Sequence, residues 1–393
     1  MNSDNGLLAT QDIRLIVTGG GTGGHTYPAL TTVNALRERL AQGGFSLDVK
    51  WVGAEDSLES RVAASNGIPF EAVATGKLRR ASNPLKMVSP ANVRDMTNVP
   101  RGAVQACSLI SDFAPDVVLA TGGYVAVPVG VAAKFVRRPL VVHEQTVRLG
   151  LANKVLARTA ARVAVSSEST VELLPDGARE YAVVTGNPVR PEIFDGRADR
   201  AVQALGFTGH DPGRPTVYVT GGAQGSKQIN DTVGALLPWL LARANVVHQC
   251  GASHLEPLRE AARELPPELE ERYHLTDFVG PELPDVLALA DVVVSRSGAG
   301  TIAELTALGK ASVLIPLASS AGGEQRHNAE HLQESGAAAA LVSEVGPDTL
   351  RKVAEPLLAD PVRRARMAER AREHGRPDAA ARLVDVVLSA ARQ

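Results

Sequence analysis

The sequence is poor in cysteine and in aromatic residues, and it carries almost no net charge. Its only cysteines are Cys107 and Cys250, too few for a disulfide framework or a zinc site, and they suit reduced thiols in a cytoplasmic protein. Aromatic residues make up 4% of the chain and the formal net charge is −2, so neither base-stacking platforms nor a basic field is available for nucleic acid. We therefore expect no nucleic-acid partner.

Long uninterrupted apolar runs are also lacking. The longest run, 117–135, approaches the length of a membrane span, but Gly122, Gly123 and Pro128 break it and predict a strand, a turn and the start of a helix. The first six residues are polar and lack the basic and apolar blocks of a signal peptide. These absences predict a cytoplasmic protein without a transmembrane helix.

The chain instead alternates short runs of Val, Leu and Ile with helical stretches rich in Ala, Leu, Arg and Glu. Strands that alternate with helices predict an α/β fold with parallel sheets covered on both faces. A chain of 393 residues fits two such domains. The expected strands are 14–18, 47–52, 117–120, 140–143, 163–166 and 183–184 in the first half and 217–220, 246–249, 275–278, 292–295, 312–315 and 339–341 in the second.

Residues that stop regular structure divide the chain near 190–210. We predict a Rossmann-like N-terminal domain over 1–195, a Rossmann-like C-terminal domain over 196–375 and a terminal helix within 376–393. Along that helix, four apolar residues fall on one face, namely Leu383, Val384, Val387 and Leu388. Such a face needs a cover, and we expect the helix to pack back on the N-terminal domain.

A glycine-rich loop follows the first expected strand of each half. The first loop begins at Gly19 and ends at His25, and the second runs from Gly221 to Ser226. Each loop can present backbone N–H groups to an anionic ligand, and the helix that follows adds a partial positive charge at its N-terminus. The repetition predicts two similar nucleotide-type folds with a cleft between them.

The first loop also matches the dinucleotide-binding pattern G-x-G-x-x-G at Gly19, Gly21 and Gly24. That reading requires an acidic residue at the end of the second strand, to bind the ribose. The first carboxylate here is Glu55, three residues beyond the strand, which disfavours NAD and FAD. A turn that serves only to pack a helix on a strand remains a simpler alternative.

Seven sequence blocks occur in the order in which the MurG family of glycosyltransferases has them. They are 20–25, 122–125, His143-Glu144-Gln145, 186–190, 221–225, 296–304, and Gln325 with Asn328. The chain resembles this family over nearly its whole length. The resemblance implies the GT-B architecture, with two Rossmann-like parallel-sheet domains facing each other across a cleft. It also implies an inverting transfer of N-acetylglucosamine from UDP-GlcNAc to lipid I, an undecaprenyl-pyrophosphate MurNAc-pentapeptide, which gives lipid II for peptidoglycan.

The resemblance also assigns donor-binding residues. They are Thr22, Gly23, Gly24, Thr146, Arg190, Ala223, Gln224, Val279, Ala299, Gly300, Thr301, Glu304 and Gln325. The loop 297–301 opens a helix and would hold the UDP pyrophosphate, with Arg190 as a planar diphosphate partner. The family implies that Glu304 binds the ribose hydroxyls, that the backbone of Val279 pairs with uracil, and that Gln325 reads the sugar. No Asp-x-Asp triplet occurs, and we expect neither a metal ion nor a cofactor.

We assign His25 as the general base, because an imidazole has a near-neutral pKa and can accept the proton of the acceptor hydroxyl. The alternative is a histidine that caps a helix or only fills space. The acceptor-side residues implied by the resemblance are Tyr124, His143, Glu144 and Gln145. Of these, His143 is a weaker second candidate for the base, and we interpret it as part of the pocket structure.

Residues 77–101 contain six basic residues and one acid, interleaved with leucine, valine and methionine. Such a segment suits an anionic membrane surface, where a lipid-linked acceptor would be found. We therefore expect a peripheral protein on the inner face of the cell membrane. A solvated basic flap is an equally simple interpretation.

The sequence departs from the family pattern in two places. Thr146 stands where the family has Asn, and Val147 and Arg148 follow where small residues are usual; Ala223 replaces a serine. The loss of one neutral hydrogen bond at Ala223 costs about 0.5–1.5 kcal/mol. The changes near Thr146 keep open a related enzyme with another acceptor, such as a secondary-metabolite or polysaccharide intermediate. A UDP-GlcNAc 2-epimerase and a non-catalytic UDP-sugar sensor are further alternatives.

Overall fold

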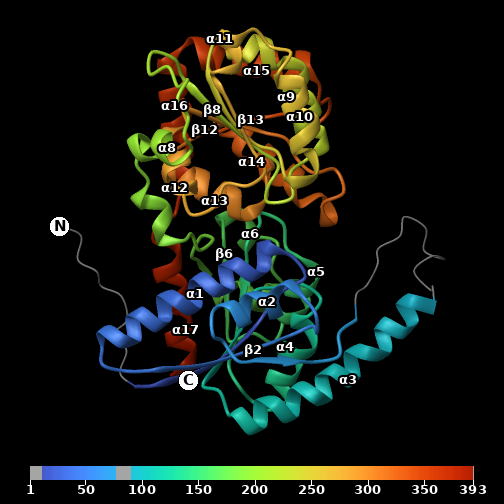
Figure 1. Ribbon diagram of the computed structural model, residues 1–393. Helices are drawn as coiled ribbons and strands as arrows, with labels where there is room; N and C mark the ends of the chain where they lie inside the picture. Colours follow the sequence, from blue (N-terminus) through green and yellow to red (C-terminus); the bar gives the residue numbers. More distant parts are fainter. Residues whose placement is uncertain (1–10, 77–89, 393) are drawn as a thin grey trace. The chain divides into compact units, whose positions relative to one another are not determined.

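The computed structural model describes residues 11–76 and 90–392, and the chain divides into two compact units (Figure 1). The N-terminal unit comprises Met1–Pro188 and Pro377–Gln393, and the C-terminal unit comprises Val189–Arg376. The division therefore falls earlier than the sequence-based boundary at residue 195. The physical reason is that Val189 and Ile193 are buried in the core of the C-terminal unit.

The described part of the N-terminal unit holds a seven-stranded parallel sheet in the order β3-β2-β1-β4-β5-β6-β7. The strands are β1 (Ile13–Thr18), β2 (Leu47–Gly53), β3 (Phe70–Ala72), β4 (Val117–Ala120), β5 (Leu140–Glu144), β6 (Arg162–Val165) and β7 (Ala182–Val184). The helices are α1 (Gly23–Gln42), α2 (Leu58–Ser65), α3 (Pro90–Phe113), α4 (Ala126–Phe135), α5 (Leu151–Leu156), α6 (Glu168–Val171), α7 (Asp176–Arg179) and α17 (Ala379–Ala391).

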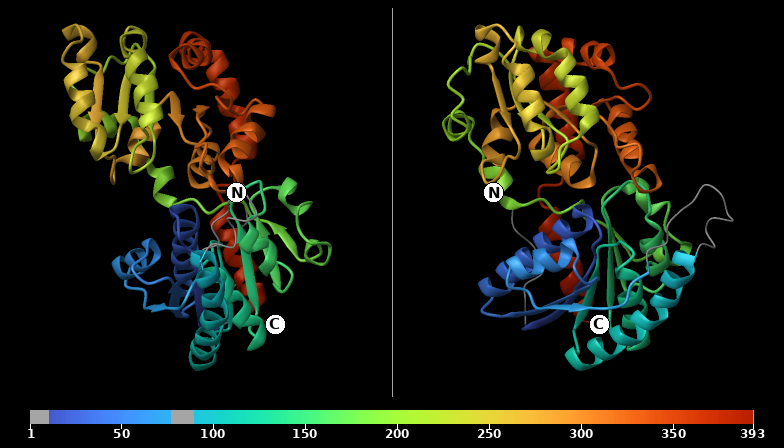
Figure 2. Two further views of the ribbon diagram at one scale, coloured as in Figure 1. Left: turned by 90° about the vertical axis from the view of Figure 1, so that its right-hand side faces the viewer. Right: turned by 45° about the vertical axis from the view of Figure 1, so that its right-hand side comes forward.

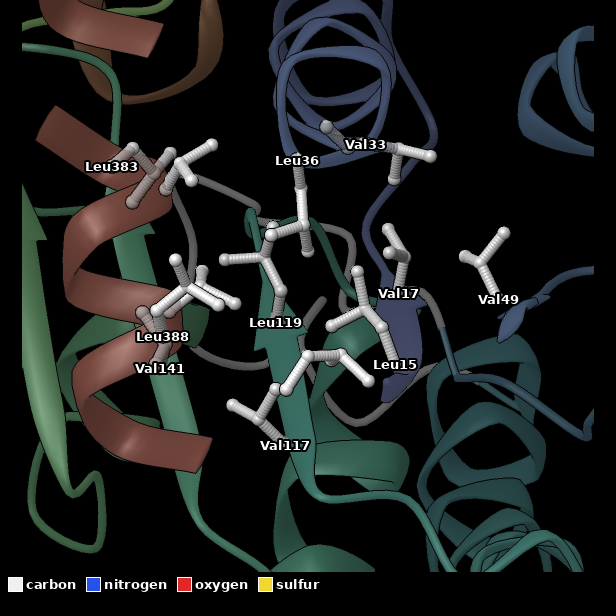
Figure 3. Close-up of a cluster of buried hydrophobic side chains, with 14 of the residues drawn as sticks. Leu15, Val17, Val33, Leu36, Val49, Val117, Leu119, Val141, Leu383 and Leu388 are labelled. Atoms are coloured by element: carbon white, nitrogen blue, oxygen red, sulfur yellow. The ribbon is translucent and has the colours of Figure 1, made fainter. Parts of the chain in front are cut away.

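Alternate residues of the central strands supply the two faces of this sheet. Leu15 and Val17 of β1 point with Leu119 into a core covered by α1 and α17 (Figure 3). Ile16 and Val118 belong to the opposite core, which α3 and α4 cover. This alternation is the period of an extended chain, and helices on both faces complete the α/β layers (Figure 2).

The C-terminal unit repeats the pattern with six parallel strands in the order β10-β9-β8-β11-β12-β13. They are β8 (Thr216–Thr220), β9 (Asn245–Gln249), β10 (Tyr273–Thr276), β11 (Val292–Ser295), β12 (Ala311–Leu314) and β13 (Ala339–Ala340). The helices are α8 (Ala198–Ala204), α9 (Lys227–Leu241), α10 (Leu255–Ala262), α11 (Pro267–Glu270), α12 (Leu283–Leu289), α13 (Ala299–Leu308), α14 (Glu324–Glu334), α15 (Pro347–Ala359) and α16 (Pro361–His374). One face packs on α9 and α15, and the other packs on α8, α12, α13, α14 and α16.

The expected α/β class with two Rossmann-like parallel sheets is confirmed. The interrupted run 117–135 is indeed a strand followed by a helix. Strand β3 was missed, because it has three residues at the sheet edge and no apolar run. The third strand of the second half lies at Tyr273–Thr276 instead of 275–278. In the described ranges, no helix is both long and apolar enough to cross a membrane.

Helix α17 begins at Ala379 and packs against α1 and against β4, β5 and β6. Leu383 and Val387 are fully buried there, together with Val384 and Leu388. The segment 379–391 therefore completes the same core as β1 and α1.

Candidate active site

Both glycine loops lie where the strand order of their sheet reverses. In the N-terminal sheet β1 lies between β2 and β4, and in the C-terminal sheet β8 lies between β9 and β11. The loops that leave the carboxyl ends of such neighbouring strands run in opposite directions, which opens a crevice at that edge. Each unit therefore has one candidate ligand site. In the N-terminal unit the site lies next to the N-terminus of α1, and in the C-terminal unit it lies next to the N-termini of α9 and α13.

In the N-terminal unit, the first glycine loop interlocks with the loop after β4. The amide of Gly20 donates to the carbonyl of Gly122 at 3.3 Å. Gly123 has a φ of +81°, and a Cβ added there would lie 2.3 Å from the carbonyl oxygen of Gly20. Only glycine permits this approach, so the two loops fix each other's position.

His25 lies in the first turn of α1 and is half-buried. Its backbone carbonyl accepts a hydrogen bond from Oγ1 of Thr121 at 2.9 Å, and its Nδ1 lies 3.0 Å from Oε1 of Gln145. Nε2 of Gln145 lies 2.7 Å from the carbonyl of Thr121 and 2.9 Å from that of His143. Carbonyls only accept, so they fix the orientation of the amide and make Oε1 the acceptor for His25.

The tautomer of His25 follows from this orientation. Nδ1 carries the proton, and in the neutral imidazole Nε2 keeps a lone pair. This is the form that a general base requires.

His143, by contrast, is fully buried in β5. Its Nε2 lies 3.0 Å from the carbonyl of Gly186 and donates to it, and its Nδ1 lies 3.1 Å from Nε2 of Gln145. Burial lowers the pKa of His143 to about 4, against the opposing effect of the bond to Gly186. His143 is therefore neutral at pH 7 and acts on the site by holding Gln145.

Glu144 holds the loop that follows β5. Glu144 is 2% exposed, and its carboxylate accepts from the amides of Thr146 and Gly150 at 3.2 and 2.8 Å and from Nδ2 of Asn153 at 3.0 Å. The hydroxyl of Thr146 lies 3.1 Å from Oε1 of Glu144 and 2.5 Å from the carbonyl of Arg148. Thr146 and Glu144 therefore shape this loop through contacts with each other, while the side chain of Arg148 is exposed.

In the C-terminal unit, the loop 296–298 leads into α13. Gly298 and Gly300 have no atom within 4 Å of an added Cβ, and neither has a positive φ. Gly298 is the N-cap of α13, where glycine is common, but neither packing nor backbone geometry explains glycine at 300, whereas the close approach of a ligand would. The first amides of α13, at Ala299, Gly300 and Thr301, have no intrahelical partner and point out of the helix N-terminus.

The side chain of Arg296 joins this loop to the second glycine loop. Its Nη2 donates to Oγ of Ser226, the N-cap of α9, at 2.6 Å. Its Nη1 donates to Oε1 of Gln228 at 2.9 Å and to the carbonyls of Ile315 and Pro316, each at 3.0 Å. Arg296 belongs to the sequence block 296–304, but nothing in the sequence indicates these contacts.

Arg190 and Glu304, both expected to bind the donor, form an ion pair with Nη2 and Oε1 3.2 Å apart. The side chain of Glu304 is 22% exposed and that of Arg190 is 51% exposed. Burial raises the pKa of Glu304 above its usual value, and the guanidinium of Arg190 partly offsets this. The carboxylate of Glu304 is thus partly exposed at the edge of the site and is paired with the guanidinium of Arg190.

Gln249, which no sequence pattern singles out, organises the region around Val279. Its Oε1 accepts from the amide of Val279 at 3.0 Å and from the hydroxyl of Tyr218 at 3.2 Å. Its Nε2 donates to the carbonyl of Gly222 at 2.9 Å. The backbone N–H of Val279 is therefore already bonded within the protein. Gln249 lies at the end of a strand without a recognised motif, so no local signal marked it.

Gln325 is tied to its neighbourhood at both ends. Its side-chain Oε1 accepts from the amide of Leu317 at 3.0 Å, and its carbonyl accepts from Oγ of Ser297 at 2.7 Å. Nδ2 of Asn328 donates to the carbonyl of Ser297 at 3.1 Å. The start of α14 is thereby fixed beside the start of α13. Ala223 and Gln224 are exposed in the second glycine loop.

The expected site residues form two groups, one in each unit. The N-terminal group comprises Thr22, Gly23, Gly24, His25, Tyr124, His143, Glu144, Gln145 and Thr146, and the C-terminal group comprises Arg190, Ala223, Gln224, Val279, Ala299, Gly300, Thr301, Glu304 and Gln325. Most of the basic segment 77–101 lies outside the described residues.

Two parallel-sheet units with candidate ligand sites at their switch points form the architecture of GT-B glycosyltransferases, and comparisons with known proteins assign the chain to that class. The model of the glycosyltransferase family 28 N-terminal domain matches residues 15–165, and that of the family 28 C-terminal domain matches residues 216–383.

A curated relative from Listeria monocytogenes serovar 1/2a is 35% identical over 96% of this chain and 99% of its own length. Its name is UDP-N-acetylglucosamine–N-acetylmuramyl-(pentapeptide) pyrophosphoryl-undecaprenol N-acetylglucosamine transferase. A crystal structure of Acinetobacter baumannii MurG has a TM-score of 0.73 with 26% identity and covers 96% of this chain and 99% of its own. The chain belongs to the MurG family of glycosyltransferases.

A UDP-GlcNAc 2-epimerase from Neisseria meningitidis, solved with UDP-GlcNAc, has a TM-score of 0.65. Its identity to this chain is 15%, over 97% of this chain and 100% of its own. At that identity the likeness shows a shared fold and nothing about the reaction.

Proposed function

We propose that this protein transfers N-acetylglucosamine from UDP-GlcNAc to the MurNAc 4-hydroxyl of lipid I, giving lipid II for peptidoglycan synthesis. The observation that carries the proposal is the 35% identity to the Listeria transferase, which extends over 96% of this chain and through both units. The printed name of that relative states the donor and a pyrophosphoryl-undecaprenol acceptor.

The C-terminal unit supplies most of the donor-binding residues in this proposal. The amides at the start of α13 bind the pyrophosphate, and the helix dipole stabilises the negative charge that develops on the departing UDP. Glu304 accepts hydrogen bonds from the ribose hydroxyls. Arg190, held beside it, supports the diphosphate with a planar guanidinium. The space over Gly298 and Gly300 favours a bulky anion at this point.

The N-terminal unit supplies the base. Nε2 of His25 takes the proton of the acceptor hydroxyl while the acceptor oxygen forms a bond to the anomeric carbon. The bond between that carbon and the β-phosphate oxygen breaks, and UDP leaves with the electron pair. A single displacement from the opposite face inverts the anomeric centre. Gln145 supports this step, because it keeps the proton of His25 on Nδ1.

The acceptor is lipid-linked, and the protein works at the inner face of the cytoplasmic membrane. The basic and apolar residues of 77–101 support this location. The exposed side chain of Arg148, beside Thr146, is the feature that favours a related enzyme with another acceptor as the second candidate.

The test is an assay of the purified protein with radiolabelled UDP-GlcNAc, with and without a short-chain lipid I analogue. Transferred label and free UDP are measured separately. We expect transfer that His25→Ala lowers by about 10²-fold or more. His210→Ala is the matched control, since His210 precedes the opposite end of β8. Donor binding without transfer to the analogue would contradict the acceptor and favour the second candidate.

A further inference from the structure

A buried carboxylate, Glu59, reaches the first glycine loop from α2. Its side chain is completely inaccessible, and Oε2 accepts a hydrogen bond from the amide of Gly21 at 3.0 Å. Oε1 accepts a longer bond from the amide of Ala54 at 3.4 Å. Glu59 stands in the first turn of α2, whose N-cap is Ser57, and a negative charge is favoured there.

The surrounding glycines make room for this side chain. A Cβ on Gly20 would lie 2.2 Å from Cδ of Glu59, and one on Gly53 would lie 3.0 Å from its Cγ. Gly20 does not have a positive φ, so the backbone conformation does not demand glycine there. The close contact with the carboxylate of Glu59 is what requires glycine at position 20.

The loop is therefore held from two sides. Glu59 supports Gly20 and Gly21 from α2, while Gly122 and Gly123 clamp Gly20 from the loop after β4. The chain then enters α1 directly, where the amide of His25 donates to the carbonyl of Thr22 at 3.2 Å. Only three residues separate Gly21, where Glu59 makes its contact, from His25, so a displacement of the loop displaces His25 as well.

We propose that Glu59 is a positioning residue for the transfer reaction: its carboxylate fixes the Gly20–Gly21 turn and thereby the place of the His25 base. This inference rests on the proposed function. The contact also occupies the N–H of Gly21, so this group is not available to an anionic ligand. The first glycine loop instead positions the His25 base. Glu59 touches no reacting atom and acts through the loop alone.

A series of three substitutions separates hydrogen bonding from charge. Glu59→Gln keeps an oxygen at the right distance for Gly21 and removes the charge. Glu59→Asp keeps the charge but is one methylene too short to reach. Glu59→Ala removes both. Glu38→Gln on α1, which is exposed, is the matched control.

Steady-state kinetics with the lipid I analogue give the first readout, with UDP-GlcNAc affinity measured by calorimetry. We expect kcat to fall about tenfold or more in Glu59→Ala and Glu59→Asp, equivalent to a loss of about 1.4 kcal/mol of transition-state stabilisation, and to stay within about threefold in Glu59→Gln. UDP-GlcNAc affinity should fall much less than kcat, because most of the expected donor residues belong to the C-terminal unit and only Thr22, Gly23 and Gly24 lie in the loop itself. Activity retained by Glu59→Asp and lost in Glu59→Gln would overturn the proposal, and so would a loss of donor affinity in parallel with kcat.

Amide hydrogen exchange over 19–26, measured by mass spectrometry, gives a readout that needs no substrate. Exchange should be faster in Glu59→Ala and Glu59→Asp and near wild type in Glu59→Gln. If the wild-type protein transfers nothing to the analogue, the proposed function fails, and the exchange data still decide whether Glu59 holds the loop. Unchanged exchange in Glu59→Ala overturns the inference, whatever the activity of the wild-type protein.

Discussion

Nδ1 of His25 and Oε1 of Gln145 lie 3.0 Å apart and join segments that are 120 residues apart in the sequence. Because the amide of Gln145 is oriented by the carbonyls of Thr121 and His143, the bond sets the tautomer of His25. Gln145 in turn depends on the neutral, buried ring of His143. The His-Glu-Gln block thus carries a chain of hydrogen bonds that ends at the proposed base.

Substitution of Gln145 should impair the chemical step more than donor binding. Gln145→Leu removes the acceptor for Nδ1–H, so the imidazole also populates the tautomer with its proton on Nε2, and we expect kcat to fall by about 10- to 100-fold. Steady-state kinetics with the lipid I analogue measure this effect. Gln42→Leu, at the exposed end of α1, is the control. Equal activities of the two variants would mean that Gln145 does not set the tautomer.

The open space at the start of α13 gives a second prediction. Gly300→Ala places a methyl group where no protein atom lies within 4 Å, and alanine stabilises a helix by about 0.5–1 kcal/mol relative to glycine. We therefore expect Tm to be equal to or higher than that of wild type, while the affinity for UDP falls by about tenfold. Calorimetry and thermal unfolding measure the two quantities.

Gly234→Ala in the middle of α9 is the matched control, because its added Cβ makes only an ordinary contact with Leu258. It should raise Tm and leave UDP affinity unchanged. If Gly300→Ala also leaves affinity unchanged, the pyrophosphate does not approach this turn.

Much of the fold follows from the sequence, because buried parallel strands are continuous Val/Leu/Ile runs that end at recognisable glycine turns. The runs that became β1, β4, β8 and β11 are examples. Strand β3 could not be found this way, since only its place beside β2 makes Phe70–Ala72 extended. The division at Pro188 likewise depends on which core buries Val189 and Ile193, and local turn residues do not encode that choice.

The site was predictable where residues stand in glycine-rich blocks and was not predictable where contacts cross the sheet. Glu59, Gln249 and Arg296 each hold a loop distant from them in the sequence. In the sequence they are an ordinary helical glutamate, a strand-end glutamine and an arginine within a motif. Their function comes from the loops that the fold brings against them.

The membrane proposal gives a prediction that can be tested with vesicles. Each basic residue near an anionic surface contributes about 1 kcal/mol, so the triple charge reversal Arg79→Glu, Arg80→Glu and Lys86→Glu should weaken binding to phosphatidylglycerol vesicles at least 100-fold. Sedimentation at low and at high salt measures the binding. Lys352→Glu, exposed in the C-terminal unit, serves as the control. If the triple variant binds the vesicles as tightly as the control does, residues 77–101 do not form the membrane-binding surface.

The substitution Glu304→Gln should raise the stability of the protein and weaken its binding of UDP-GlcNAc. Burial raises the pKa of its carboxyl above the unfolded value, so the folded protein carries an unfavourable ionised group at neutral pH. This destabilisation is present above the folded pKa, is relieved as the pH falls through it, and is absent below the unfolded pKa. Glu304→Gln should therefore have a higher Tm than wild type at pH 7, and the difference should vanish near pH 4.

The same substitution should weaken UDP-GlcNAc binding about 10- to 100-fold, since an amide replaces the charged acceptor proposed for the ribose hydroxyls. Glu355→Gln, half-exposed in an ion pair on α15, should change neither quantity by a comparable amount. Arg190→Gln removes the cation that lowers the pKa of Glu304. When Glu304→Gln is made in the Arg190→Gln protein, it should therefore raise Tm by more than it does in the wild type. A Tm for Glu304→Gln that lies below wild type at pH 7 would show that the ion pair outweighs the cost of burial. Glutamate would then be retained here for stability, and the donor affinity of the variant would decide whether it also binds the ribose.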